Sequence, residues 1–172
     1  IQAAYNDKAI DGELNEGNIK DCDLILLCLY PQLCIDYLTK MAPYIRKDAM
    51  VIDCCGTKEL ICQSCYPIAK QYGFTFIGGH PMAGSEKTGF ENSTDILLEN
   101  AYYLLTPFEE TPLENLSLLK ELVAKTGANC VVLSPSEHDK ITAAISHVPH
   151  IIAVSLVNIC LLYTSLPTKL EV

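Results

Sequence analysis

The sequence predicts an α/β fold in which an incomplete, mainly parallel sheet is followed by the start of an all-helical domain. Short, continuous apolar runs alternate with helical segments up to residue 133, as strands buried on both faces alternate with their crossover helices. Beyond residue 133 two helical patterns follow each other without another strand pattern. With 172 residues, 49% of them hydrophobic, the chain is long and apolar enough for one globular core.

Each predicted strand is an apolar run that ends at a turn residue. The five runs are residues 23–29, 49–53, 74–77, 101–105 and 129–133. Helices are predicted between them at 31–44, 57–72 and 112–125. Pro31 and Pro112 suit the first turns of their helices, and Gly127 ends the third helix.

The helical part begins at a capping box, Ser134-Pro-Ser-Glu137. Ile141, Ala144, Ile145 and Val148 then form one apolar stripe, and we expect the segment around Pro149 to break or kink the helix. A second apolar helix continues to about residue 162. Polar residues interrupt it before it reaches the roughly 18 apolar residues of a membrane span, so we interpret it as a core helix.

Composition excludes several classes of partner and site. The net charge is −9 and Arg46 is the single arginine, which argues against binding to nucleic acid or to an anionic membrane. Nine cysteines, an odd number, and no secretory signal indicate a reduced, cytoplasmic protein. Cys62 and Cys65 have the spacing of a metal pair, but no second pair or histidine lies nearby, so we expect no metal.

Three segments follow strands at the edge of the sheet where parallel sheets bind ligands: Tyr30-Pro31, residues 53–58 and residues 78–89. The last segment presents a base, a hydroxyl and a carboxylate, on His80, Ser85 and Glu86. Gly78 and Gly79 precede the histidine, and we expect them to let a ligand approach the backbone closely. The alternative is a polar loop with an incidental histidine.

Three motifs, in this order, resemble the prephenate dehydrogenase family. They are His80-Pro-Met-Ala-Gly-Ser-Glu-Lys-Thr-Gly89, Glu99-Asn-Ala-Tyr-Tyr-Leu-Leu-Thr-Pro107 and Ser146-His-Val-Pro-His150. The resemblance covers about residues 20–160. It implies a Rossmann-type nicotinamide-binding domain at 1–133 and the beginning of a helical dimerisation and substrate domain at 134–172, with an atypical tail from about residue 163.

The resemblance also implies the reaction, oxidative decarboxylation of prephenate to 4-hydroxyphenylpyruvate with NAD or NADP in tyrosine biosynthesis. Arogenate is the alternative substrate, because arogenate dehydrogenases share these motifs. Loss of the carboxylate leaves an aromatic ring, which drives the reaction. A homodimer is implied for the full-length protein.

Residue roles follow from the same resemblance. His80 is the general base that accepts the substrate hydroxyl proton, and His147 contacts substrate. Ser85 and Glu86 line the substrate pocket. The residues implied to touch the cofactor are Leu29, Tyr30, Pro31, Gly56 and Thr57.

The chain departs from the family at both ends. No glycine-rich pyrophosphate loop and no arginine clamp for the substrate carboxylate are present, so we expect a fragment that is inactive alone. Gly56 stands where many members carry serine. Asp53 belongs to the turn implied to touch the cofactor, and the alternative is a residue of a helix N-cap region. For His147 the alternative to a substrate contact is a polar residue at a domain junction. We expect His138 to face solvent and His150 to be structural.

Two other classes of function remain open. One is a hydroxyacid dehydrogenase of related build, although such enzymes rely on a lysine in the helical domain and none lies near His147. The other is a non-catalytic ligand-binding module that retains the fold.

Overall fold

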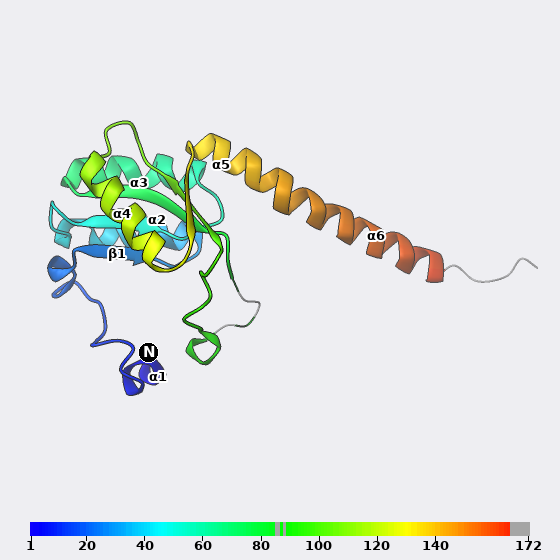
Figure 1. Cartoon of the computed structure of the whole chain (residues 1–172), viewed down its shortest axis with the longest axis horizontal. Coiled ribbons are helices and arrows are strands. Elements are labelled where there is room, and N and C mark those ends of the chain that lie inside the picture. The colour runs from blue at the N-terminus through cyan, green and yellow to red at the C-terminus, as the bar shows by residue number, and fades with distance from the viewer. Residues whose placement is uncertain (85–86, 88, 166–172) are drawn as a thin grey trace, which may run out of the picture. The chain divides into compact units, whose positions relative to one another are not determined.

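The structure is a computed structural model that describes residues 1–84, 87 and 89–165, in two compact units, Ile1–His138 and Asp139–Val172. The strands are β1 (Leu24–Leu27), β2 (Met50–Asp53), β3 (Thr75–Pro81), β4 (Tyr102–Thr106) and β5 (Asn129–Val132) (Figure 1). The α-helices are α1 (Gln2–Asn6), α2 (Pro31–Met41), α3 (Glu59–Tyr72), α4 (Leu113–Lys125), α5 (Pro135–Thr142) and α6 (Val148–Ser165). Short 3₁₀ turns lie at Ile19–Asp21, Ala42–Tyr44 and Phe90–Asn92, and a π-helical turn at Ala143–His147.

The five strands form one sheet in the order β1-β2-β3-β4-β5, which confirms the predicted mainly parallel α/β fold. β1, β2 and β3 are parallel, and so are β4 and β5. β3 and β4 are antiparallel, which the sequence interpretation did not anticipate. The described part of the connection between them contains only the 3₁₀ turn Phe90–Asn92 and no crossover helix, so the chain turns back at the same edge of the sheet.

Helices cover both faces of the sheet. Successive side chains of a strand point to opposite faces of the sheet. Neighbouring residues of β2 and β3 therefore pack in two different apolar clusters, one on each face. Val51 and Phe76 pack in the cluster that contains the buried residues of α2 and α3, while Ile52 and Ile77 pack with Leu119 of α4 and its neighbours. The first unit is therefore a three-layer α/β/α structure with a core of its own.

β3 continues beyond the predicted end at residue 77 and includes His80. His80 therefore lies at the end of a strand, as predicted, but within the strand and not in the segment that follows it. The extension exists because β4 supplies a partner: Gly78 pairs with Thr106, and His80 with Leu104. His80 is thus held by the sheet itself, and a strand positions a side chain more precisely than a loop does.

The helical unit begins within one long helix. The capping box predicted at its start is confirmed, since the Glu137 carboxylate accepts the Ser134 N–H at 3.0 Å and the Ser134 hydroxyl accepts the Glu137 N–H at 3.2 Å. The break expected near Pro149 takes the form of the π-helical turn Ala143–His147, after which α6 continues the helix. Proline has no N–H to donate to the preceding turn, and the regular bonding pattern changes just before it.

Among the described residues, one helix, Pro135–Tyr163, is long and apolar enough to cross a membrane by length and composition, with a mean hydropathy of 1.8. A core helix of a soluble protein passes the same test. α6 exposes apolar side chains on all sides, for example Ile152 (54% exposed) and Leu156 (57%). The interpretation of this segment as a core helix is therefore wrong for the single chain, in which α6 is exposed.

Candidate functional site

A groove of about 720 Å³ lies at the carboxyl ends of β1 and β2, beside the end of β3. It is lined by Cys28, Leu29, Tyr30, Pro31, Leu33, Cys54, Cys55, Gly56, Pro81 and Ala83. Four of the five residues predicted to touch the cofactor are therefore brought together. The fifth, Thr57, is exposed and does not line the groove. Ligands of open α/β sheets bind at this edge.

His80 lies half-buried beside the groove, between two different neighbours. Its Nδ1 lies 2.8 Å from Nε2 of His138, a hydrogen bond in which either ring can donate according to its tautomer. The opposite edge of the ring faces Gly56, where an added Cβ would lie 3.8 Å from both Cε1 and Nε2. His80 is therefore bonded through Nδ1 to His138, and its Cε1–Nε2 edge faces a residue that lines the groove.

His138 is 0% exposed, so the prediction that it faces solvent is wrong. Its N–H donates to the Ser134 carbonyl at 2.9 Å, which places it in the first turn set by the capping box. The sequence indicates this helix start, but not which side of the turn faces the sheet. His138 is a residue of this cluster that sequence reasoning missed, because its burial depends on His80, which is distant in the sequence.

A buried ion pair holds the backbone next to His80. The carboxylate of Asp53 pairs with Lys58, and both side chains are fully buried. The same carboxylate accepts the N–H of Cys55 at 2.9 Å and that of Gly79 at 3.1 Å. Asp53 thus connects the end of β2, the turn that follows it and the residue before His80.

The alternative interpretation of Asp53, as a helix N-cap, is wrong. α3 begins at Glu59 after Lys58, and no side chain caps it. Lys58 was missed as an internal partner of Asp53, although both residues belong to the turn that the sequence singled out. Nothing in their spacing distinguishes a buried pair from two groups that face a cofactor.

Gly78 and Gly79 allow close packing of the protein against itself. A Cβ at Gly78 would lie 2.1 Å from Oγ1 of Thr106, and one at Gly79 would lie 2.6 Å from the carbonyl oxygen of Asp53. The expectation that these glycines leave room for a ligand is therefore wrong, because protein atoms occupy that space. Their role is to bring β3 close to its neighbours on both sides.

The remaining predicted site residues are His147, which belongs to the helical unit, and Ser85 and Glu86. His147 ends the π-helical turn of the helical unit and is exposed, as is His150. Ser85 and Glu86 lie outside the described residues. Among the residues that the structure describes, no group of three or more His, Cys, Asp or Glu side chains is arranged to hold a metal ion.

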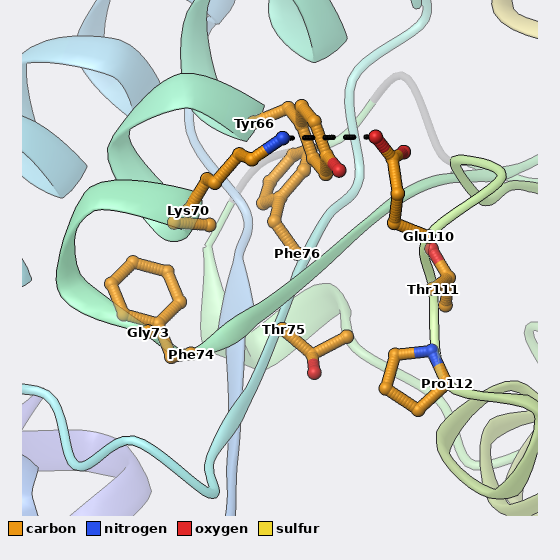
Figure 2. Close-up of a pocket in the computed structure, with 10 residues that line it drawn as sticks. Tyr66, Lys70, Gly73, Phe74, Thr75, Phe76, Glu110, Thr111 and Pro112 are labelled. Atoms are coloured by element: carbon orange, nitrogen blue, oxygen red, sulfur yellow. Dashed lines mark ion pairs between the residues drawn. The ribbon is translucent and has the colours of Figure 1, made fainter.

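A second hollow, of about 270 Å³, lies at the other edge of the sheet, around the start of β3 (Figure 2). Lys70 and Tyr66 of α3 face Glu110 across it, and Lys70 Nζ lies 3.7 Å from Glu110 Oε1. Hydrogen bonding to Glu110 raises the pKa of the Tyr66 hydroxyl. Both charged side chains are more than half exposed, so the pair contributes little to stability. The amino edge of a parallel sheet is not where such folds bind ligands, which favours the groove beside His80.

Comparison with known proteins identifies the family. Residues 1–133 match the family model of the prephenate dehydrogenase nucleotide-binding domain, and residues 134–170 match that of the prephenate dehydrogenase dimerization domain. A prephenate dehydrogenase of Bacillus subtilis (strain 168) is 40% identical over 114 residues, which are 66% of this chain and 30% of that protein.

Two solved structures are similar over nearly the whole chain. Prephenate dehydrogenase from Aquifex aeolicus, in complex with hydroxyphenyl propionate and NAD+, has a TM-score of 0.84 and 30% identity, over 97% of this chain and 58% of the other. Synechocystis arogenate dehydrogenase has a TM-score of 0.82 and 31% identity, over 92% and 56%. The chain thus spans less than two thirds of these relatives. With both family models matched in succession, the chain belongs to the prephenate dehydrogenase family.

Proposed function

We propose that the chain forms part of an NAD(P)+-dependent dehydrogenase that oxidatively decarboxylates prephenate. The observation that carries the proposal is the placement of His80, which is held by β3, bonded through Nδ1 to His138 and directed toward the groove at Gly56. A fixed imidazole at a ligand-binding edge is what removal of a hydroxyl proton requires. Membership of the family supplies the substrate class.

The groove fits the nicotinamide end of a dinucleotide. Its lining is mostly apolar, comes from the carboxyl ends of parallel strands, and has a volume within the usual range of ligand sites. Leu29, Tyr30, Pro31 and Gly56 would contact the cofactor there, with Thr57 at the margin. The bound nicotinamide supplies the acceptor for the hydride that leaves the substrate ring.

The His80–His138 bond defines how the base works. When Nδ1 of His80 carries the hydrogen and donates it to Nε2 of His138, Nε2 of His80 carries the lone pair that accepts the substrate proton. His80 then becomes an imidazolium while its bond to His138 remains. His138 therefore acts as a positioning residue that selects the tautomer.

Three further residues contact the substrate in this proposal, His147 of the helical unit and Ser85 and Glu86 of the α/β unit. α6 buries its apolar surface against a second copy of the chain in a homodimer, as the match to a dimerization domain suggests. The division into a cofactor domain at 1–133 and a helical domain from 134, and a cytoplasmic location, complete the proposal.

The test uses the protein encoded by the whole reading frame that contains these residues. His80→Asn keeps a polar side chain but removes the base, and it should lower kcat for NAD+-dependent turnover of prephenate by about 10²- to 10⁴-fold while KM changes little. His150→Asn, in a histidine outside the groove, serves as the matched control and should retain turnover. Wild-type-like turnover by His80→Asn would show that another group is the base.

Companion measurements separate the alternatives. His138→Gln retains an acceptor for the His80 Nδ1–H, whereas His138→Leu removes it, so the glutamine variant should recover part of the kcat that the leucine variant loses. Parallel assays with arogenate decide the second candidate substrate, which the similarity to Synechocystis arogenate dehydrogenase favours. If the wild-type protein binds prephenate but does not turn it over, the protein is a ligand-binding module and not an enzyme.

A further inference from the structure

Two pairs of cysteine thiols lie at the carboxyl edge of β1 and β2. The Sγ atoms of Cys28 and Cys54 are 3.7 Å apart, and those of Cys34 and Cys55 are 3.6 Å apart. The proposed reaction uses none of these four thiols. The pairs are nearly equal in distance but differ in their surroundings, and that difference determines what each can do.

Cys28 and Cys54 are placed for a disulfide by the sheet. Leu27 and Asp53 are register partners in the parallel β1/β2 ladder, so Cys28 and Cys54 occupy the next rung. Adjacent strands lie about 4.8 Å apart, within the range of about 4.4–6.8 Å between Cα atoms that a disulfide spans. The short distance between the sulfur atoms shows that both side chains point to the same side. The backbone therefore needs little movement for the S–S bond to form.

Cys28 is also accessible and activated. It is exposed and lines the groove together with the half-buried Cys54. The hydrogen bond with Cys54 lowers the pKa of the Cys28 thiol to about 7, against the opposite effect of its partial burial. The same hydrogen bond and burial raise the pKa of Cys54. An accessible thiol with a lowered pKa beside a second thiol is the arrangement found in redox-sensing cysteines.

The second pair lacks these properties. Cys34 is 0% exposed and Cys55 4% exposed. Both thiols contact the carbonyl oxygen of Leu29, at 3.4 Å. Burial, and then the nearby charge of Asp53, raise the pKa of Cys55. Proximity alone therefore does not make a reactive pair here, and the buried pair serves as an internal comparison.

We propose that Cys28 and Cys54 are a redox-modification site, at which hydrogen peroxide converts the two thiols into a reversible disulfide in the wall of the groove. The Cys28 thiolate attacks a peroxide oxygen, the O–O bond breaks, and a sulfenic acid and one water form. The Cys54 sulfur then attacks the Cys28 sulfur, the S–O bond breaks, and a second water leaves. Two thiols lose two electrons and two protons, and the peroxide is reduced to two waters.

The disulfide changes the groove. Bond formation shortens the sulfur–sulfur distance from 3.7 Å to about 2.05 Å, which fixes the Cys28 and Cys54 side chains in a new position with little movement of the backbone. Both side chains line the groove, so its wall changes shape where the dinucleotide is proposed to bind. We expect oxidation to lower dinucleotide affinity by about tenfold, equivalent to about 1.4 kcal/mol. This effect rests on the function proposed above, whereas the disulfide itself does not.

The experiment treats the protein encoded by the whole reading frame with hydrogen peroxide and then with dithiothreitol. Peptide mapping should find Cys28 linked to Cys54, with no Cys34–Cys55 link, and dithiothreitol should reverse the linkage. NAD+ affinity should fall on oxidation and recover on reduction. Cys28→Ser and Cys54→Ser should each lose this response when compared with their own reduced forms, and Cys160→Ser, at an exposed position in α6, should keep it.

Absence of the Cys28–Cys54 link, or preferential linkage of Cys34 to Cys55, would overturn the site. A mapped link with unchanged NAD+ affinity would overturn its effect on the cofactor. If the reduced wild-type protein binds neither NAD+ nor NADP+, the proposed function fails, and the peptide map still decides whether the disulfide forms.

Discussion

The two units of this chain differ in how far they bury their apolar side chains. In the α/β unit, two clusters of apolar side chains are enclosed by helices on both faces of the sheet, and the buried Asp53 and Lys58 are paired with each other. In the helical unit, α6 presents large apolar side chains to its surroundings, among them Ile152 and Leu156. The α/β unit encloses its apolar side chains, whereas α6 leaves its apolar side chains exposed.

This difference separates residues that stabilise the α/β unit from residues of α6 that do not. The α/β unit encloses two apolar clusters of its own, and His80 is held by contacts within residues 1–138. The apolar residues of α6 are exposed and contribute little to that core. Substitutions in the two units should therefore differ in which property they change, and the size of their effect on stability should fall from the centre of the sheet to α6.

The largest loss of stability should come from breaking the buried ion pair. Lys58→Met leaves the Asp53 carboxylate buried without its cation, and we expect the free energy of unfolding to fall by about 3–5 kcal/mol. Urea unfolding followed by circular dichroism measures it. The matched control is the double variant Asp53→Asn/Lys58→Met, which removes both charges and should recover more than about 1 kcal/mol of the loss. Equal instability of the single and double variants would contradict a stabilising pair.

A smaller loss should follow from filling the space at Gly78. In Gly78→Ala the new Cβ would lie 2.1 Å from Oγ1 of Thr106 and 2.7 Å from Sγ of Cys62, so β3 and β4 must separate, at a cost of about 1–3 kcal/mol. Gly12→Ala, which meets no atom within 4 Å, should change stability by less than about 0.5 kcal/mol. Adding Thr106→Ala should make the Gly78 substitution less costly. If it does not, the close approach to Thr106 is not the cause.

Much of the fold could be predicted from the sequence, because continuous apolar runs and their turn residues are local signals. The positions of the strands, the capping box at Ser134 and the glycine that ends α4 are of this kind. The direction of β4, the extension of β3 through His80 and the burial of His138 were not predicted. Each depends on a partner distant in the sequence. The direction of β4 and the extension of β3 depend on the pairing of the two strands, for example His80 with Leu104, and the burial of His138 depends on its contact with His80. The Asp53–Lys58 pair was missed for a related reason, since residue type and spacing do not reveal that a pair is buried.

The smallest effect on stability, and the largest on assembly, should come from α6. Ile152→Lys places a charge on a side chain that is 54% exposed in the single chain, so the free energy of unfolding of the α/β unit should change by less than about 0.5 kcal/mol. In the protein from the whole reading frame the same charge would be buried in the proposed dimer, where an unpaired charge is costly, and sedimentation velocity should show a shift from dimer to monomer. Lys120→Ala, in α4 of the α/β unit, provides a control that should leave the dimer intact. If the wild-type protein is monomeric and sediments with phosphatidylcholine vesicles, α6 is covered by lipid and the dimer is excluded, because its apolar surface cannot be buried in both ways at once.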